Sequence, residues 1–362
     1  MTPQTRNGIL QFHRWAGLTV GLMILFMAIT GATLIFRKQL EPLAESALLR
    51  IPACAARLPL DDLAAAVLRV HPAGRLDYVR IFGAADAAIL FRFGNKDTVF
   101  LNPCTGDVLG QQNRFGGLFG ALEFIHRFKF VDGGDLIAGV SALIFVVVIA
   151  IGGAAVWWPT SWRGLKASLK LNLRLRGRLR DVDLHRLTGA YAGIIILASA
   201  LTGLPQAFDW YKDALYIIAG SPLPDRHFES KPDTAARLPM EAIWQHARNL
   251  VSSPAEALLH YPNKPDEAVE IYLIEKDAPH ANARTYLFLD AYSNAVVSFT
   301  PYAESSPGHR LYFWTLSWHT GQAGLLGQVV LLFGALAVPV LAYTGIASYF
   351  ARRRRAILLD QR

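Results

Sequence analysis

Four long apolar stretches constrain this chain more than any other feature of its sequence. They cover roughly residues 15–36, 136–158, 187–208 and 325–350. A helix of about 20 residues, rising ~1.5 Å per residue, crosses the ~30 Å hydrocarbon core of a bilayer. The first stretch is too long for the apolar core of a secretory signal, and Ile35-Phe36-Arg37-Lys38 is a poor cleavage site. We therefore predict an integral membrane protein with four spans.

The positions of the basic residues predict how these spans are oriented. The loop between the second and third stretches contains seven cations and two acids, and the chain ends in an arginine run: Arg163, Lys166, Lys170, Arg174, Arg176, Arg178 and Arg180, with Asp181 and Asp183, then Arg352–Arg355. An excess of Lys and Arg in short loops marks the cytoplasmic side. We expect both termini and the middle loop in the cytoplasm and the two long loops outside, which means the periplasm if the source is a Gram-negative bacterium. This topology explains the net charge of +8 without nucleic-acid binding.

The sequence also repeats itself. One set of positions recurs after 172 residues: His13, Arg14, Gly17, Gly21, Thr30 and Gly31 match His185, Arg186, Gly189, Gly193, Thr202 and Gly203. A second set recurs after 193 residues: His126, Gly134 and Gly152 match His319, Gly327 and Gly345. An internal repeat determines the architecture of the chain. We predict a four-helix transmembrane bundle that arose by internal duplication, with two outward-facing α+β domains.

The expected segments follow in chain order. They are a cytoplasmic lead and first span (1–36), an outward domain (37–125), a histidine segment and second span (126–158), a basic cytoplasmic loop (159–184), a third span (185–208), a second outward domain (209–318), and a fourth span with a basic tail (319–362). Each outward domain is predicted to hold one helix and three antiparallel strands, at 78–82, 88–93 and 98–101 and again at 256–261, 268–274 and 285–289. Alternating apolar and polar residues at 169–176 predict a short strand or hairpin on the membrane surface, although solvated positive-inside charge is a sufficient explanation of this segment.

Four histidines lie at two depths in this arrangement. The first and third spans both run outward, which places His13 and His185 at the inner surface, whereas His126 and His319 lie near the outer surface. A lone histidine at a helix end is usually a polar anchor, but paired histidines at one depth suit axial ligation of a haem iron. No CxxCH motif occurs, which excludes covalent c-type attachment.

Neighbouring residues are compatible with a haem and also have simpler explanations. Gly17 and Gly21 follow His13 on one helical face and leave room for a flat macrocycle, although small-residue helix packing would look the same. Three arginines follow histidines directly and could pair with haem propionates: Arg14, Arg186 and Arg127. Anchoring at the inner surface explains the first two equally well.

Three motifs together resemble a known family. They are the doubled His-Arg-x-x-Gly…Thr-Gly helices, Trp318-His319-Thr320-Gly321-Gln322, and Leu101-Asn102-Pro103-Cys104-Thr105-Gly106-Asp107. The chain resembles the PepSY-associated transmembrane family, and within it the inner-membrane ferric-siderophore (ferrioxamine-type) reductases. The resemblance implies periplasmic PepSY-like domains and two haem b groups, ligated by His13 with His185 and by His126 with His319. It also implies that a ferric siderophore is reduced in the periplasm.

Several points stay open at this stage. The electron donor could be a quinol or a cytoplasmic reductase. His309, Arg310, Tyr312 and Trp314 are candidate substrate contacts, although an interfacial aromatic belt explains them better, and His309 could replace His126 as the outer ligand. Cys54 and Cys104 suggest a disulfide in an oxidising compartment, the alternative being two unpaired buried cysteines. A transporter or a haem-free protein that binds a periplasmic partner are the alternative functions.

Overall fold

The computed structural model describes residues 2–54, 56–72, 74–94, 96–159, 161–225, 227–232, 236–251 and 254–360. The chain divides into two compact units. The helical unit comprises Met1–Phe36, Leu122–Lys212 and Trp318–Arg362, and the sheet unit comprises Arg37–Ala121 and Asp213–Ser317. Each unit is therefore built from both halves of the sequence.

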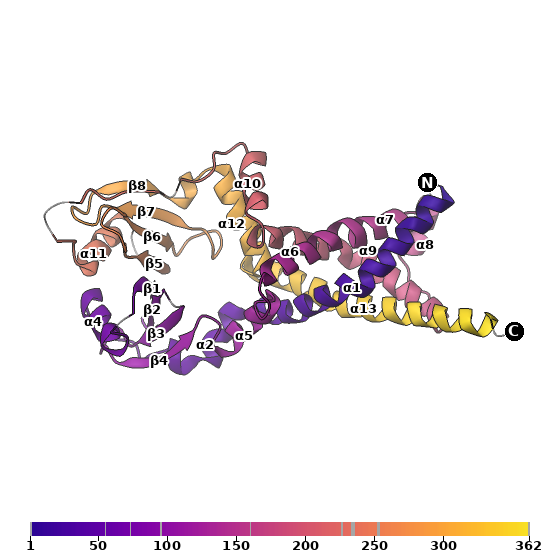
Figure 1. The fold of residues 1–362 in the computed structure, drawn as a ribbon, viewed down its shortest axis with the longest axis horizontal. Helices are drawn as coiled ribbons and strands as arrows, with labels where there is room; N and C mark the ends of the chain where they lie inside the picture. The colour runs from indigo at the N-terminus through magenta and orange to yellow at the C-terminus, as the bar shows by residue number, and fades with distance from the viewer. Residues whose placement is uncertain are drawn as a thin grey trace. The chain divides into compact units, whose positions relative to one another are not determined.

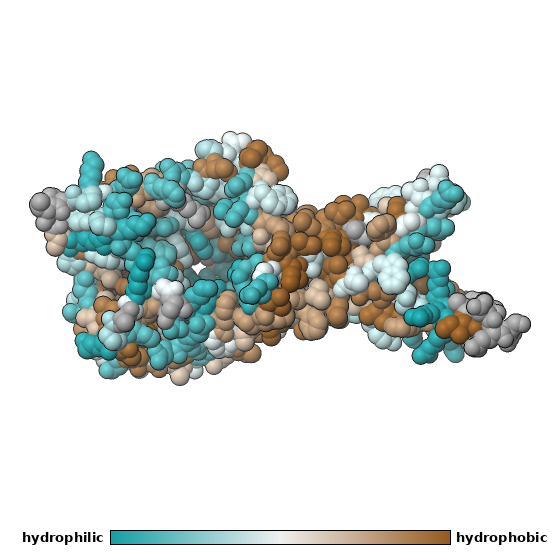
Figure 2. Space-filling view, in the orientation of Figure 1, coloured by the Kyte–Doolittle hydropathy of each residue, from teal (hydrophilic) through white to brown (hydrophobic). Residues whose placement is uncertain are grey.

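Four candidate membrane spans form the helical unit (Figure 1), as the sequence predicts. They are α1 (Pro3–Leu34), the run α6 (Gly134–Ile144), η1 (Phe145–Ile151) and α7 (Gly152–Trp157), α9 (Arg178–Gly203) with η2 (Leu204–Gln206), and α13 (Gly324–Asp360). The surface of this unit is hydrophobic over its middle part (Figure 2). Among the residues of the spans, Leu326 and Ile194 are 78% and 76% exposed, which suits contact with lipid.

The helices extend beyond the apolar runs that predict them. Thr2 caps α1 by accepting a hydrogen bond from Thr5 N, and Pro3 occupies the first turn, where its missing N–H is harmless. Helix α9 begins after Gly177, seven positions before the first residue of the expected span 185–208. His13 and His185 consequently lie inside helices, where neighbouring turns hold their backbones rigidly.

A seven-residue π-helix, η1, interrupts the second span. Such segments are rare and arise where an extra residue is accommodated within an α-helix. The equivalent part of α13 is α-helical throughout, although it contains Pro339. Because of this difference, the correspondence between the two halves changes by one residue within the second span, as the contacts described below demonstrate.

The sheet unit contains one continuous antiparallel sheet of eight strands, in the order β4-β3-β2-β1-β5-β6-β7-β8. Its strands are β1 (Leu76–Phe82), β2 (Ile89–Phe93), β3 (Asp97–Leu101), β4 (Val108–Asn113), β5 (Glu256–His260), β6 (Val269–Ile274), β7 (Thr285–Leu289) and β8 (Val296–Thr300). The prediction of two separate domains at 37–125 and 209–318 is therefore wrong. Strand β1 pairs with β5, with Arg80 opposite Leu258, and joins the two segments.

One face of this sheet packs against helices α4 (Leu60–Val70) and α11 (Met240–Leu250). Alternate residues of the central strands point to them, including the fully buried Val79, Phe91, Leu259 and Ile271. Period-two burial of this kind is what an antiparallel sheet covered on one side requires. The apolar residues of both halves therefore share one core.

Two other predictions differ from the structure. Strands β4 and β8 were not expected, because neither alternates clearly between apolar and polar residues: β4 is largely polar, and β8 is largely apolar but mostly exposed. Residues 169–176 form no strand; helix α8 (Trp162–Ser168) precedes them, and Asp183 accepts a hydrogen bond from Asn172 N. The alternating pattern there reflects a solvated basic loop.

The elements of the first half recur in the same order in the second half. Helix α2 (Arg37–Ala44) follows α1 as α10 (Asp209–Ile218) follows α9, and α5 (Gly117–His126) precedes the second span as α12 (Pro307–His319) precedes the fourth. The short helices α3 (Ser46–Leu49) and η3 (Tyr302–Glu304) have no such counterparts among the described residues. Two of the four histidines therefore end the equivalent helices α5 and α12.

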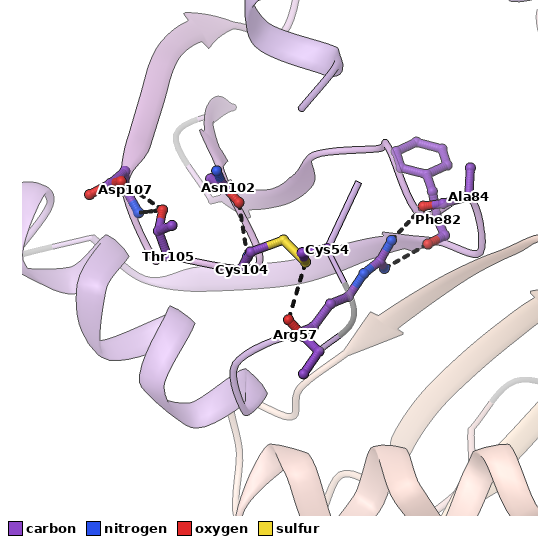
Figure 3. The surroundings of a disulfide bond; sticks show 9 residues. Cys54, Arg57, Phe82, Ala84, Asn102, Cys104, Thr105 and Asp107 are labelled. Atoms are coloured by element: carbon purple, nitrogen blue, oxygen red, sulfur yellow. Dashed lines mark hydrogen bonds between the residues drawn. A yellow bond between two sulfur atoms is a disulfide. The ribbon is translucent and has the colours of Figure 1, made fainter. Parts of the chain in front are cut away.

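Cys54 and Cys104 form a disulfide in the sheet unit (Figure 3). Cys104 lies in the turn between β3 and β4, where Asn102 Oδ1 accepts a hydrogen bond from its backbone N–H at 2.9 Å. The bond links this turn to the segment that leads into α4. Of the two alternatives left open by the sequence, the structure has the disulfide.

Candidate functional site

The four predicted histidines meet as two pairs within the helical unit. The ring centres of His13 on α1 and His185 on α9 are 6.1 Å apart, with their planes at 89°. Those of His126 at the end of α5 and His319 at the end of α12 are 6.2 Å apart, with their planes at 52°. These are the pairings expected from the depth argument.

Each histidine is held by a hydrogen bond from its Nδ1 atom to a different helix. The ring of His13 bonds to Ile149 O at 3.1 Å, that of His185 to Leu341 O at 3.0 Å, and that of His319 to Ser199 O at 3.0 Å. The fourth ring, His126, bonds to Thr30 Oγ1 at 3.0 Å and also reaches the backbone of Met27. All four rings are thus held through Nδ1 by an oxygen atom of another helix.

These contacts determine the tautomer of the imidazoles. A carbonyl oxygen can only accept, so an Nδ1 atom bonded to one must carry the proton. Thr30 Oγ1 donates its own hydrogen to Phe26 O at 2.7 Å and therefore accepts from His126. The lone pair of each neutral ring then lies on Nε2, and metal-ligating histidines commonly donate their other ring N–H to an acceptor in this way.

Every ring also packs against a glycine of another span. The contacts are His13 with Gly153, His185 with Gly345, His126 with Gly31, and His319 with Gly203. A Cβ atom at Gly203 would lie 2.6 Å from His319 Cε1, and one at Gly153 would lie 3.0 Å from His13 Cε1. The glycines of the Thr-Gly repeat therefore allow the opposite ring to approach its helix.

The π-helix explains why one predicted correspondence is off by a residue. The sequence aligns Gly152 with Gly345 at a shift of 193, but the glycine that contacts a histidine is Gly153. The carbonyls that accept from the first pair, Ile149 O and Leu341 O, are likewise 192 positions apart. The extra residue of η1 accounts for the difference.

The separation within each pair is compatible with two imidazoles on one iron. A metal–imidazole bond is about 2 Å long, so two rings on opposite sides of one metal have centres about 6.3 Å apart. Among the described residues, no group of three or more His, Cys, Asp or Glu side chains is placed to hold a metal ion. Each pair offers two imidazoles, which would hold the iron of a bound haem.

An apolar layer lies between the two pairs. It is formed by one cluster from all four spans: Ile24, Phe145, Val146, Ala192, Ile196, Ala337 and Val338. Gly31 lies 18 positions after His13, and Gly203 lies 18 after His185, so the two levels are about 27 Å apart along the helices. We call the level of His13 the basic end, because α9 begins and α13 ends there with arginines.

Comparison with known proteins identifies the family of the chain. A family model, the PepSY-associated TM region, matches residues 10–352 and so includes all four histidines. The chain belongs to this family. A comparison with curated proteins gives no match. Membership of the family makes the chain a membrane protein, in agreement with its four apolar helices.

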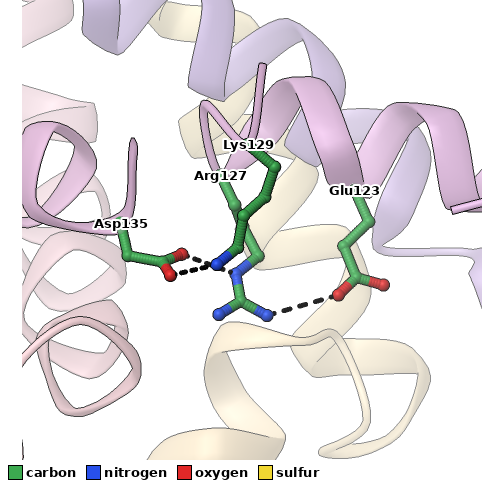
Figure 4. A network of polar contacts seen from close by, with 4 residues as sticks. All are labelled: Glu123, Arg127, Lys129 and Asp135. Carbon is green, nitrogen blue, oxygen red and sulfur yellow. Dashed lines mark hydrogen bonds and ion pairs between the residues drawn. The ribbon is translucent and has the colours of Figure 1, made fainter. Parts of the chain in front are cut away.

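In this family member, two of the arginines beside the histidines already have carboxylate partners. Arg127 pairs with Asp135 at 3.1 Å and with Glu123 at 3.4 Å, and Lys129 also pairs with Asp135 (Figure 4). Arg186 pairs with Asp183. Arg14 is half-buried on α1. The network at Arg127 ties the end of α5 to the start of α6, and Asp135 was not singled out by the sequence because one acid near a helix start is common.

Space remains beside several glycines of the repeat. A Cβ atom at Gly17, Gly21 or Gly193 would meet nothing within 4 Å. At the basic end, Arg186 Nε and Trp157 Nε1 are buried without a hydrogen-bond partner among the described residues. Open space and unsatisfied donors beside the first histidine pair are compatible with a bulky ligand that bears acceptors.

The four candidate substrate residues lie on α12 in the sheet unit. His309 is 8% exposed, and its ring packs against Phe313 at 4.7 Å and Tyr286 at 5.6 Å. It therefore contributes to an aromatic cluster, whereas His126 is the ring that faces His319. Arg310 and Trp314 are exposed and Tyr312 is half-buried, so these three remain accessible.

Proposed function

We propose that this protein is a dihaem b-type oxidoreductase that carries electrons across the bacterial inner membrane and reduces ferric siderophores in the periplasm. The observation that carries the proposal is the pair of histidine levels, with ring centres 6.1 and 6.2 Å apart and every Nδ1 atom hydrogen-bonded. In this proposal the ligands are His13 with His185 and His126 with His319.

Bound haem would supply one-electron chemistry. The chain's own residues hold each imidazole in one orientation through carbonyls and Thr30, and the glycines allow the rings to approach. The layer around Ala192 and Ile196 keeps water and ions out of the region between the levels. Electrons can then pass between the two histidine levels, whereas ions cannot.

Reduction outside the membrane would release iron by a simple chemical difference. Ferric iron binds hard oxygen donors more strongly than ferrous iron does, so one electron weakens a siderophore complex and releases Fe(II). The exposed Arg310 and Trp314 are proposed contacts for the chelate. We further propose that the basic end faces the cytoplasm and that the repeated elements arose by duplication.

The first experiment is the dithionite-reduced minus oxidised visible spectrum of the purified full-length protein, with a haem count per chain. We expect two haem b in the wild type and one in His185→Ala, followed by reduction of a ferric siderophore by the loaded protein. A protein that carries no haem after expression with ample haem would overturn the proposal. That outcome would favour a haem-free protein whose sheet unit binds a periplasmic partner.

A further inference from the structure

A groove of about 340 Å³ lies between α9 and α13 in the helical unit. Its lining is mostly apolar: Leu187, Thr188, Tyr191, Phe333, Leu336, Ala337 and Val340. All of these residues lie within the candidate membrane spans Arg178–Gln206 and Gly324–Arg354. A ligand of this groove must therefore be able to dissolve in the lipid phase.

The groove is next to the histidine pair of the basic end. Thr188 and Tyr191 follow His185 within two turns of α9. On the other wall, Val340 precedes Leu341, whose carbonyl accepts the hydrogen bond from His185 Nδ1. The groove and His185 therefore share the same two helices, and a ligand in the groove would lie close to this level.

Two hydroxyl groups distinguish the groove from a simple site for an acyl chain. Four threonines of the spans donate to carbonyls of their own helix: Thr19, Thr30, Thr202 and Thr344. Thr188 makes no such bond to any residue that the structure describes. Tyr191 donates to Leu169 O at 3.1 Å, and its oxygen can still accept a hydrogen bond. The apolar lining thus carries one available donor and two acceptors.

We propose that this groove binds a membrane hydroquinone, which is the electron donor of the reaction; this inference rests on the proposed function. A hydroquinone has an apolar tail, a flat ring and two hydroxyl groups that Thr188 and Tyr191 can recognise. Its oxidation breaks two O–H bonds and yields the quinone, two protons and two electrons. Each electron reduces one ferric chelate to Fe(II), so one hydroquinone serves two chelates and the two protons leave at the basic end.

The test uses the full-length protein in lipid nanodiscs and a photoreactive azidoquinone, with the labelled peptides identified by mass spectrometry. We expect labelling on residues 187–191 or 333–340. Leu336→Trp fills the groove and should lower that labelling at least fivefold. Leu326→Trp is the matched control, because Leu326 is on the same helix, is 78% exposed and does not line the groove. Thr188→Val should weaken labelling without changing the thermal stability.

The outcomes separate this inference from the proposed function. Labelling that is absent, unaffected by Leu336→Trp, or displaced equally by excess phospholipid would overturn the hydroquinone site. Labelling that occurs only in haem-free protein would also overturn it, since the groove would then belong to the haem. If the loaded protein is reduced by dithionite but not by a short-chain hydroquinone, only this inference fails. Specific labelling of a chain that binds no haem would contradict the proposed function and the donor role that rests on it, and would leave only the binding of the hydroquinone.

Discussion

Asp61 and Glu241 each cap the helix to which the other belongs. Asp61 accepts hydrogen bonds from Met240 N at 2.9 Å and Glu241 N at 3.0 Å, and Glu241 accepts one from Leu60 N at 2.8 Å. Both helices start after a proline without a side-chain cap of their own. The reciprocal contact, across 180 positions, therefore links the two halves of the sheet unit.

The substitution Asp61→Ala should lower the free energy of unfolding of the sheet unit by about 1–2 kcal/mol, because two N–H groups of α11 lose their acceptor. Asp62→Ala is the control, since Asp62 is exposed on the same turn and is not the cap of α11. Thermal unfolding of the full-length protein measures the difference. Equal effects of the two substitutions would contradict the capping role.

The histidine substitutions should act in pairs. His13→Ala and His185→Ala should each remove one haem, and His126→Ala and His319→Ala should each remove the other, because a single imidazole holds a haem less tightly than two. Haem content per chain and the reduced spectrum measure this. His309→Ala should retain both haems, and loss of the outer haem in that variant would show that the second pair is misassigned.

Alanine at two of the glycines that contact a histidine ring should have unequal effects. The added Cβ would lie 2.6 Å from His319 in Gly203→Ala but 3.4 Å from His185 in Gly345→Ala. The first contact forces the ring to move, whereas the second is an ordinary contact. We expect a spectral shift or loss at the His319 level in Gly203→Ala and a nearly unchanged spectrum in Gly345→Ala. Similar spectra for both variants would argue against tight packing at His319.

The sheet unit should lose stability in acid. Burial lowers the pKa of His280 to about 4, and its ring bonds to Tyr302 Oη and Ser317 Oγ at 2.7 Å each. In the unfolded chain His280 binds a proton below a pH of about 6.5, whereas in the folded chain it stays neutral until the pH falls to about 4. Stability from this group is therefore complete above pH 6.5 and is lost as the pH falls towards 4, by at most about 3 kcal/mol. Unfolding of His280→Gln between pH 7 and 4 should lack this dependence.

Reduction of the disulfide should also destabilise the sheet unit. The bond between Cys54 and Cys104 spans 50 positions, and closing a loop of this size typically contributes about 2–4 kcal/mol. The double substitution Cys54→Ser with Cys104→Ser should lower the melting temperature to that of the wild type in reductant. A wild type unaffected by reductant would show that this bond contributes little.

The sequence predicts the spans and the histidine pairs well, because both follow from local periodicity and from the depth at which a helix begins. The contacts of the rings could not be predicted. They depend on how four helices pack. They also depend on the π-helix η1, because of which the glycine that contacts His13 is Gly153 and not Gly152, the residue that the repeat aligns with Gly345. Helix propensity gives no signal for such an insertion.

The arrangement of the strands in the segments 37–125 and 209–318 was predictable only within each half. Strands β1 and β5 are recognisable from their alternating residues, but the pairing of Arg80 with Leu258 joins positions that are distant in sequence. An alternating pattern indicates a strand but does not indicate which other strand pairs with its edge. The two segments were therefore expected as separate domains, because the pairing of β1 with β5 could not be predicted.

The pairing of β1 with β5 has a consequence for any shorter relative of this chain. A polypeptide that ended after α7 would have all elements of the first half but would leave the β1 edge without a partner, and unpaired edges associate. Antiparallel pairing is symmetric, so two identical copies could meet through β1 as β1 and β5 do here. On the duplication proposed above, a half-length ancestor would have functioned as a homodimer, and gene fusion would later have made the partnership permanent.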